Sequence, residues 1–499
     1  MRETMQKRLR TVVKTPVTTA LLCLAFGCAR VGGSSGGPRD GGDAPPASDA
    51  RDAVLQDLPV PANDASAPLP AQVTCDGGAT TSVSGTVFAP NGKLPLYNVA
   101  VYVPKAPLEP FAAGVTCDRC GTPVSGKPIV STLSDSEGKF KLLNVPAGMN
   151  IPLVFQVGKW RRKVTVPNVT ACQDTALPDP NMTRLPRNRT EGDLPKIAVT
   201  TGTCDQLGCL LPKLGVDASE LGIAGESKSA AYFASQQEIM TGPACPQCGP
   251  ANMRPATELW NDEAVLSKYD MTLLSCECSE NLATKPAMSL LAMSNYLAKG
   301  GRIFGSHYAY AWLRNSPDMA LTAAVTISTQ GPTFGLFPLK IDASFPKGKA
   351  LAEWMKFVDP STVYGEIASY QTFNAVRAVK PPSAVAWASS GSSTTPPLPP
   401  GFPPIAGADP NAIDPTPHPR IITVTTPAGM PADKQCGRVA YLDAHIVLDS
   451  NTAPANSTFP GSCGPTLSKG EEALAFLLFD LAACIQDDTK PVVPPIIVP

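Results

Sequence analysis

The segment from Met271 to Ser306 is the part of the sequence that most constrains the fold. MTLLSC is a short apolar run, PAMSLLAMSNYLAKGG has apolar residues at helical spacing before a Gly-Gly stop, and RIFGS is a second apolar run. Strand, helix and strand at this spacing require a right-handed crossover between two parallel strands. The segment therefore predicts an α/β domain built on a parallel sheet.

Further runs extend this α/β domain over residues 196–486. KIAVTTG, IITVTTPAG and GRVAYLDAHIVL predict strands, and IDASFPKGKALAEWMKFV predicts a helix that carries a tryptophan. SKGEEALAFLLFDLAACI predicts a closing amphipathic helix, in which Ser468 and Glu471 form a capping box. The proline-rich segment 380–419 predicts an inserted loop, and residues 487–499 predict a disordered tail.

The N-terminus has the features of an export signal. A basic stretch precedes TALLCLAFG, an apolar run that is too short to span a bilayer. The run ends in AFGC, which resembles a bacterial lipobox, whose cysteine (here Cys28) receives lipid after cleavage of residues before it. The resemblance implies a signal peptide within residues 1–28 and a lipid anchor, and Ala29 favours the outer membrane. Ordinary secretion or release into the periplasm, without an anchor, is the alternative.

Residues 29–73 consist largely of Gly, Pro, Ser, Ala and Asp. Such a segment cannot bury enough apolar surface to offset the entropy lost on ordering. We expect a disordered stalk, with a root-mean-square length of roughly 35–40 Å for a flexible chain of about 45 residues. A stalk of this kind holds a folded part away from a membrane.

Thirteen cysteines follow Cys28, and two close pairs among them have the spacing of zinc knuckles. These pairs are Cys117 with Cys120, and Cys245 with Cys248. The pairs are far apart in the chain, and an exported protein meets an oxidising environment, so disulfides are the expected state. Zinc bound by either pair is the alternative.

The odd number of these cysteines predicts one thiol that has no partner within the chain. Spacing alone does not define the connectivity. Cys276 and Cys278 stand on either side of Glu277, and in an exported protein we expect both to be bridged rather than reactive.

Residues 74–182 contain strand-like runs separated by turns. Four motifs occur in order: VSGTV at 83–87, NVAVYV at 98–103, DSEGKF at 135–140 and VPAG at 145–148. Together they resemble the carboxypeptidase regulatory-like domain. The resemblance implies an all-β, prealbumin-like sandwich with a structural or adhesive role, and residues 183–195 are the expected linker to the α/β domain.

The α/β domain carries a second set of motifs. YDMTLLSCE, a helix, YLAKGGRIFGSH and the late GRVAYLDAH resemble the ThuA-like branch of the class I glutamine-amidotransferase superfamily. The late motif has one residue more between Val439 and Tyr441 than the family pattern. The resemblance implies a flavodoxin-like domain. The whole layout resembles a group of exported bacterial lipoproteins, some of which carry the label tryptophan synthase alpha chain, a chemistry that no motif here supports.

Parallel sheets bind ligands beyond the carboxyl ends of their strands. Four candidate catalytic residues fall there: Glu277 after the second strand, His307 after the third, and Asp443 and His445 on the last. Asp443 and His445 are two residues apart on a predicted strand and so point the same way. Two histidines with a carboxylate suit acid–base catalysis or metal ligation, and a structural role for His307 is equally open.

The turn after the third strand argues against amidotransferase chemistry. That family holds its nucleophile in a G-x-C-x-G turn, and the corresponding residues 305–309 are GSHYA, which also fails to match G-x-S-x-G. A non-catalytic domain with neither cofactor nor metal is therefore the expected state. Ser306, Tyr308, Tyr310 and Trp312 are candidate ligand-binding residues, since aromatic faces suit sugar rings; packing in the core is the alternative.

The expected function is that of an envelope lipoprotein with a binding or structural role, with a glycan or an envelope protein as partner. The basic residues Lys159 and 161–163 can bind an anionic glycan or form a solvated strand face. A hydrolase or isomerase that acts on a sugar-derived small molecule through His307 and His445 is the alternative. With 41 basic and 42 acidic residues, the chain gives no reason to expect a nucleic-acid partner.

Overall fold

The computed structural model describes residues 69–202, 204–223, 228–234, 253–328, 335–373, 375–393, 413–445 and 463–497. All of them belong to one compact unit, Asn63–Pro499. The expected signal peptide with Cys28, nearly all of the stalk, and the pair Cys245 and Cys248 lie outside the described residues. Within the described part of the chain, none of the helices combines the length and apolarity that crossing a membrane requires.

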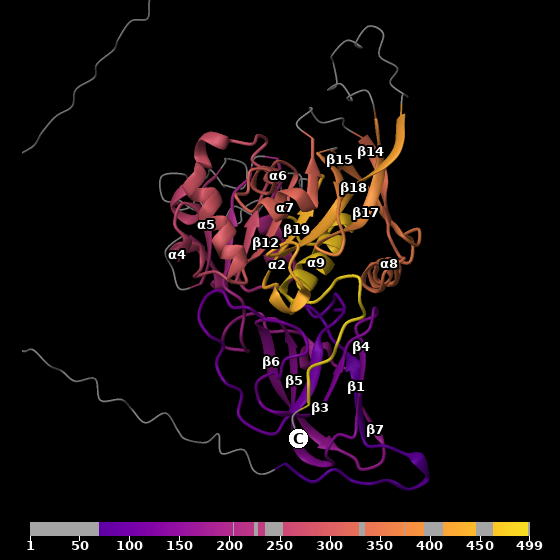
Figure 1. The fold of residues 1–499 in the computed structure, drawn as a ribbon. Coiled ribbons are helices and arrows are strands. Elements are labelled where there is room, and N and C mark those ends of the chain that lie inside the picture. Colours follow the sequence, from indigo (N-terminus) through magenta and orange to yellow (C-terminus); the bar gives the residue numbers. More distant parts are fainter. Residues whose placement is uncertain are drawn as a thin grey trace, which may run out of the picture. The chain divides into compact units, whose positions relative to one another are not determined.

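Two β-sheets make up the first part of this unit (Figure 1). One has the strand order β4-β1-β7 and the other β3-β2-β5-β6. The strands are β1 Ser82–Thr86, β2 Ala100–Pro104, β3 Pro128–Leu133, β4 Lys139–Leu143, β5 Gly148–Val157, β6 Trp160–Val169 and β7 Asp174–Leu177. Along β4 the buried Phe140 and Leu142 alternate with exposed residues. Because the Phe140 ring meets Phe155 of β5 edge-on at 5.8 Å, the two sheets share a core, as the sequence predicts.

The second part is built on one mixed sheet of ten strands in the order β15-β14-β17-β18-β19-β12-β11-β8-β10-β9. Its strands are β8 Ile197–Thr200, β9 Leu221–Ile223, β10 Ser229–Tyr232, β11 Met271–Leu274, β12 Arg302–Ser306, β14 Gly335–Ile341, β15 Glu366–Thr372, β17 Ala384–Ser393, β18 Ile413–Thr426 and β19 Gly437–Leu442. The strands from β19 to β9 run parallel, which confirms the predicted parallel sheet. The remaining four strands, β18, β17, β14 and β15, extend the sheet in antiparallel fashion. Outside this sheet, β13 Val325–Ile327 pairs with β16 Val376–Val379.

The parallel strands have a doubly wound order. Numbered along the chain with β9 left out, the sequence β10-β8-β11-β12-β19 is 2-1-3-4-5. The order reverses between β8 and β11, and sheets of this type bind ligands at the carboxyl ends of the strands beside such a reversal. Figure 1 shows β12 and β19 as neighbours within this sheet.

Helices cover both faces of the sheet. They are α2 Leu210–Lys213, α3 Thr257–Trp260, α4 Glu263–Leu266, α5 Ala287–Ala298, α6 Tyr310–Arg314, α7 Met319–Ala324, α8 Pro346–Val358 and α9 Lys469–Ala482, whereas the short α1 Pro180–Thr183 contacts β1 and β7 of the first part. Successive side chains of a strand face opposite ways. Ile303 and Val439 therefore pack in one core cluster with α5 and α6, while Phe304 and Ala440 pack in another with α8 and α9. The predicted capping box of Ser468 begins α9.

Five disulfides brace this unit: Cys75–Cys172, Cys117–Cys436, Cys120–Cys484, Cys204–Cys278 and Cys209–Cys463. They confirm the predicted disulfides and are typical of an oxidising compartment. Cys117 and Cys120 each bond to a distant cysteine, so this pair is no zinc knuckle. Among the described cysteines Cys276 alone is a free thiol, and the expectation that it is bridged was wrong; Cys278 is bridged.

Three segments, expected as an inserted loop, a linker and a disordered tail, are more ordered than the sequence predicts. The arms of the proline-rich segment form the paired strands β17 and β18, and only residues 394–412 lie outside the described structure. The expected linker is anchored, since Asp193 pairs with the backbone of Arg161. The expected tail enters the core at Asp488, whose side chain contacts Lys347 and Arg438. In each case long-range partners order a segment that local composition marks as a loop.

Candidate functional site

Polar residues gather where the central parallel strands end. Cys276 lies two residues beyond β11, His307 directly follows β12, and His445 lies three residues beyond β19. Asp205 follows β8. Because the carboxyl ends of parallel strands meet at one edge of the sheet, residues far apart in the sequence come together there.

Three of these side chains meet at one point. His307 Nδ1 lies 2.9 Å from His445 Nε2, and Cys276 Sγ lies 3.5 Å from the first nitrogen and 3.3 Å from the second. Cys276 and His307 are buried, and His445 is half-buried. The ring of Phe373 stacks on His307, with centroids 3.4 Å apart, and meets the His445 ring at 4.5 Å. We refer to Cys276, His307 and His445 as the Cys–His–His cluster.

A tight turn from strand to helix positions His307. Ser306 ends β12 in extended conformation, and His307 begins a short 3₁₀ helix, His307–Ala309, with φ of 37°. A left-handed backbone is strained in residues other than glycine and is held only when the surroundings demand it. The hydroxyl of Tyr441 donates to the His307 carbonyl at 2.7 Å and helps to hold the turn.

Gly305 makes this turn possible. A Cβ atom added to Gly305 would lie 2.9 Å from the Cβ of Ala309, closer than two such atoms pack. The space beside the strand is thus available only to glycine. Glycine is therefore required at position 305, because the chain passes close to the end of β12 directly after the turn.

The hydroxyl of Ser306 is engaged by a buried carboxylate. Ser306 Oγ donates to Asp205, and the other oxygen of Asp205 accepts the backbone N–H of Cys276 at 2.7 Å. Burial raises the pKa of Asp205 to about 6, against the opposing effect of these two hydrogen bonds. Asp205 therefore connects the turn after β12 to the residue that follows β11.

The cluster is uncharged at neutral pH. Burial, with a smaller effect from His445, lowers the pKa of His307 to about 2, and burial lowers that of His445 to about 4. Burial and then the charge of Asp205 raise the pKa of the Cys276 thiol. An activated cysteine nucleophile needs a lowered pKa beside a cationic group. The cluster has the opposite character: one neutral thiol and two neutral imidazoles.

The two candidate carboxylates do not join the histidines. Asp443 is fully buried, and its carboxylate accepts the N–H groups of Ala375 and Val376 and the hydroxyl of Tyr441. Because β19 ends at Leu442, Asp443 lies beyond the strand, and the expectation that it points with His445 fails.

The carboxylate of Glu277 also contacts residues outside the cluster. Its carboxylate forms an ion pair of 2.7 Å with Lys285 and accepts from Asn281. The structure therefore brings together His307 and His445 of the four catalytic candidates, and assigns both carboxylates to structural contacts.

The aromatic candidates divide between the cluster and the core. Tyr310 and Trp312 are buried, with the Tyr310 hydroxyl bonded to Glu280 and the Trp312 ring packed on Trp260 at 5.2 Å. Tyr308 is half-buried, and its ring lies 4.1 Å from that of His307. A sugar-stacking surface made by Tyr310 and Trp312 is therefore excluded by their burial.

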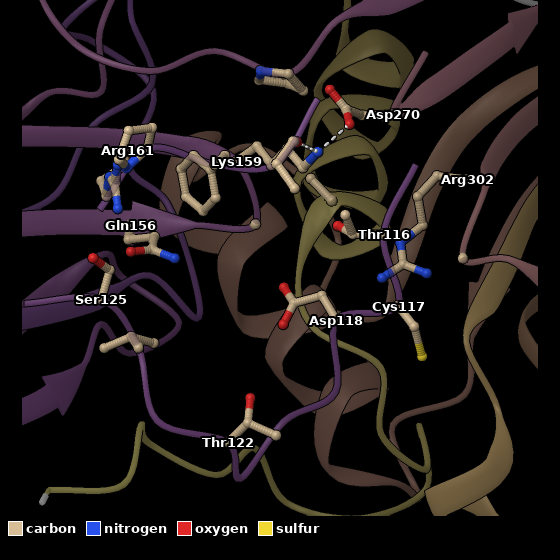
Figure 2. Close-up of a pocket in the computed structure, with 18 of the residues that line it drawn as sticks. Thr116, Cys117, Asp118, Thr122, Ser125, Gln156, Lys159, Arg161, Asp270 and Arg302 are labelled. Carbon is tan, nitrogen blue, oxygen red and sulfur yellow. Dashed lines mark hydrogen bonds and ion pairs between the residues drawn. The ribbon is translucent and has the colours of Figure 1, made fainter. Parts of the chain in front are cut away.

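The basic run of β6 lies beside a separate cavity of about 320 Å³. Figure 2 shows Lys159 extending to Asp270, and the two form an ion pair of 2.6 Å. Arg161 pairs with Asp193 and stacks on the ring of Phe111. Lys159 and Arg161 are therefore already neutralised and offer no free positive charge, whereas Lys163 is exposed on the strand.

Cys276 and Asp205 are site residues that the sequence interpretation missed. Cys276 directly follows the apolar run MTLLS, so its place at the carboxyl edge beside the reversal of strand order was open to inference. The odd number of cysteines also indicated a free thiol. Asp205 had no comparable signal, because its role depends on two partners 71 and 101 residues away.

No family model matches the sequence, and no curated protein matches it. Two crystal structures of a type II cohesin–X-dockerin complex from Acetivibrio cellulolyticus, an N-terminal and a C-terminal interface mutant, are similar to 28% and 27% of this chain. The matches cover 85% and 83% of those chains at 16% identity, with TM-scores of 0.16 and 0.15. Scores this low do not establish a shared fold.

Proposed function

We propose that the protein is an exported, lipid-anchored envelope protein whose role is binding rather than hydrolysis. In this proposal residues 74–182 are a carboxypeptidase regulatory-like module, residues 196–486 are a ThuA-like domain, and the Cys–His–His cluster is the ligand site. The signal-like N-terminus, the composition of the stalk and the five disulfides support export. Envelope glycans and envelope proteins are the proposed partners of the assembly.

The observation that carries the binding role is the convergence of one buried thiol and two imidazoles, whose donor atoms lie 2.9–3.5 Å from one another. His307 occupies the turn where an amidotransferase would hold its nucleophile, and the adjacent Ser306 hydroxyl is bonded to Asp205. Nucleophilic catalysis needs a deprotonated or base-activated group. Lone pairs on three neutral groups that face one another are instead suited to holding a ligand.

The binding role predicts an absence of hydrolase activity. We expect the purified full chain to release no ammonia from glutamine, and to hydrolyse p-nitrophenyl acetate no faster than its Cys276→Ser variant, because the thiol is buried and its pKa is raised. Turnover more than about tenfold above that variant would contradict the proposal and favour an activated cysteine.

The hydrogen-bond distance between the two imidazoles favours a second candidate, an acid–base isomerase or hydrolase for a sugar-derived molecule. Such an enzyme requires one histidine to accept a proton and the other to donate it near neutral pH. Aldose–ketose conversion that is lost in both His307→Ala and His445→Ala would select this alternative.

The lipid anchor is tested by labelling. In cells that express the protein, radioactive palmitate is expected to label the wild-type chain and to leave Cys28→Ser unlabelled, because Cys28 is the acceptor in the lipobox-like segment. Cys23→Ser, which changes a cysteine five residues away within the same segment, is the control and should be labelled as wild type. Equal labelling of the Cys28→Ser chain would exclude the anchor.

A further inference from the structure

We infer that the Cys–His–His cluster binds a divalent transition-metal cation of the zinc type, with Cys276, His307 and His445 as ligands. The inference rests on the proposed binding role and names the class of ligand. Thiolate sulfur with two imidazole nitrogens is a donor set that suits borderline-soft cations such as Zn²⁺ and Co²⁺.

The spacing of the three donor atoms fits a common central ion. With bonds of about 2.3 Å to sulfur and about 2.0 Å to nitrogen, tetrahedral coordination separates sulfur and nitrogen by about 3.5 Å and two nitrogens by about 3.3 Å. The corresponding distances here are 3.5, 3.3 and 2.9 Å. Shifts of a few tenths of an ångström complete the geometry.

Hydrogen bonds alone cannot account for all three contacts among Cys276 Sγ, His307 Nδ1 and His445 Nε2. A thiol has one proton to donate, and each ring nitrogen has either one proton or one lone pair in the ring plane. If one imidazole N–H bonds to the other nitrogen, the thiol proton has no lone pair left; if the thiol bonds to a nitrogen, the 2.9 Å contact between the nitrogens remains unbonded. At most two of the three contacts can be hydrogen bonds.

A cation satisfies all three contacts at once. Cys276 releases its proton to solvent, and the sulfur and both nitrogens each donate an electron pair to the metal. Imidazole coordinates a metal through the lone pair of one ring nitrogen, and His307 Nδ1 and His445 Nε2 are the nitrogens that face the sulfur. Three protein ligands leave the fourth tetrahedral position to a further ligand.

Two backbone N–H groups face the sulfur of Cys276. The backbone N–H of Cys278 donates to Cys276 Sγ at 3.4 Å, and the backbone of Tyr308 also donates to it. A neutral thiol is a weak acceptor, whereas a metal-bound thiolate benefits from two such donors. The carboxylate of Asp205, bonded to the N–H of Cys276, adds negative charge beside the cation.

A disulfide adjoins the site and limits the ligand set. Cys204 Sγ lies within 4.8 Å of both Cys276 Sγ and a ring nitrogen of His445, which makes Cys204 a further candidate ligand by distance. However, Cys204 is bonded to Cys278, and only a free thiolate coordinates zinc. In the oxidised protein we therefore assign the metal to Cys276 and the two histidines alone.

Cobalt titration of the full chain with its disulfides intact tests the inference. We expect one equivalent of Co²⁺ to give the sulfur-to-cobalt charge-transfer absorption of a thiolate ligand, and equimolar Zn²⁺ to remove it. Cys276→Ser should lose this absorption, and His445→Gln should weaken cobalt binding at least tenfold. The double variant Cys245→Ser/Cys248→Ser should keep the absorption, since the cysteines of the CPQC motif are not the proposed ligands.

The outcomes separate the two proposals. Absence of cobalt absorption in the wild type, or its persistence in Cys276→Ser, would overturn the metal site, as would its loss in the CPQC double variant. Circular dichroism establishes that each variant is folded, and His445→Gln replaces Cys276→Ser if the latter is not. Failure of cobalt binding without esterase activity leaves the binding role intact, whereas turnover that depends on Cys276 defeats that role whatever the cobalt result.

Discussion

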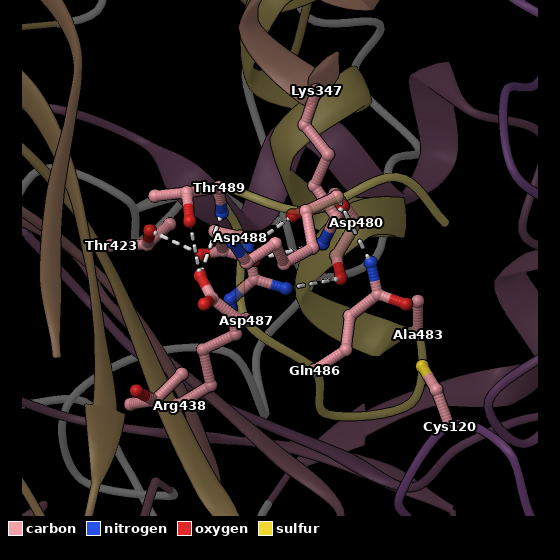
Figure 3. Close-up of polar contacts among 12 residues, drawn as sticks. Cys120, Lys347, Thr423, Arg438, Asp480, Ala483, Gln486, Asp487, Asp488 and Thr489 are labelled. Carbon is pink, nitrogen blue, oxygen red and sulfur yellow. Dashed lines mark hydrogen bonds and ion pairs between the residues drawn. The ribbon is translucent and has the colours of Figure 1, made fainter. Parts of the chain in front are cut away.

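Replacing Asp488 by asparagine is expected to lower the free energy of unfolding by about 3–5 kcal/mol, the cost of leaving a buried charge uncompensated. Asp488 belongs to a network of four buried charges with Lys347 on α8, Arg438 on β19 and Asp480 on α9 (Figure 3). Their side chains are at most 2% exposed. Two positive and two negative charges balance, so removing one carboxylate leaves a net positive charge in the core.

The contacts of Asp488 explain why asparagine is a poor substitute. One carboxylate oxygen lies 2.8 Å from Lys347 Nζ, and the other lies 2.7 Å from Arg438 and accepts from the hydroxyl of Thr423 at 2.6 Å. All three partners are donors. An amide group presents N–H where one of these donors points, so the variant loses a charge and gains an unfavourable contact.

The same network gives the stability a pH dependence of known sign. Burial opposes ionisation of Asp488, but Arg438 and Lys347 outweigh it, so the pKa of Asp488 lies below its ordinary value. A carboxyl whose folded pKa is depressed stabilises the protein above the unfolded pKa of about 3.9 and loses this contribution as the pH falls through the folded value. The deficit of Asp488→Asn should therefore shrink below about pH 4.

The matched control is Asp487→Asn, which changes the adjacent aspartate. Asp487 is half-buried and accepts the N–H of Thr489 in a turn, so its replacement should cost about 1 kcal/mol or less. Urea unfolding of both variants at pH 7, with disulfides intact, measures the difference. Equal midpoints for Asp487→Asn and Asp488→Asn would show that the network contributes nothing specific.

Asp488 also shows where inference from sequence ends. The parallel sheet was predictable, because strand and helix periods in the segment 271–306 are local patterns. The order of the tail was not, because the partners of Asp488 stand 50 and 141 residues away, at Arg438 and Lys347. A tail of prolines, valines and isoleucines with two adjacent aspartates has no local pattern that marks which aspartate is buried.

The candidate site was likewise predictable only in part. The approach of His307 to His445 was predictable, because both follow neighbouring parallel strands, β12 and β19. The free thiol of Cys276 was not, because it depends on Cys204 taking Cys278 as its partner, and connectivity requires knowledge of which Cα atoms lie close in space. The loss of Asp443 from the site follows from where β19 ends, which is the least reliable part of any sequence-based assignment.

Replacing Phe476 by alanine is expected to have an effect as large as that of Asp488→Asn, about 3–5 kcal/mol, because it opens a cavity in an aromatic core. Phe476 of α9 is 4% exposed. Its ring stacks on Tyr97, which precedes β2 in the sandwich, at 5.5 Å, and meets Trp354 and Trp387 edge-on at 5.4 and 6.3 Å. The same ring thus belongs to the cores of both parts of the chain.

This shared core changes what unfolding should look like. A linker at 183–195 would let the sandwich unfold by itself, whereas Tyr97, Phe476 and Trp354 form one continuous cluster, and Trp354 Nε1 donates to the carbonyl of Pro95 at 2.8 Å. We therefore expect a single transition in urea, with coincident midpoints by tryptophan fluorescence and by far-ultraviolet circular dichroism.

Phe357→Ala is the control, since Phe357 lies on α8 and is 42% exposed. It should change the free energy of unfolding by about 1 kcal/mol or less, because Phe357 lies at the surface and its removal opens no buried cavity. A Phe476→Ala protein with the stability of Phe357→Ala would contradict the shared core. Separate transitions in the wild type would do the same, because α9 and Tyr97 would then belong to parts that unfold independently, and the interface around Phe476 would be a contact between domains rather than a common interior.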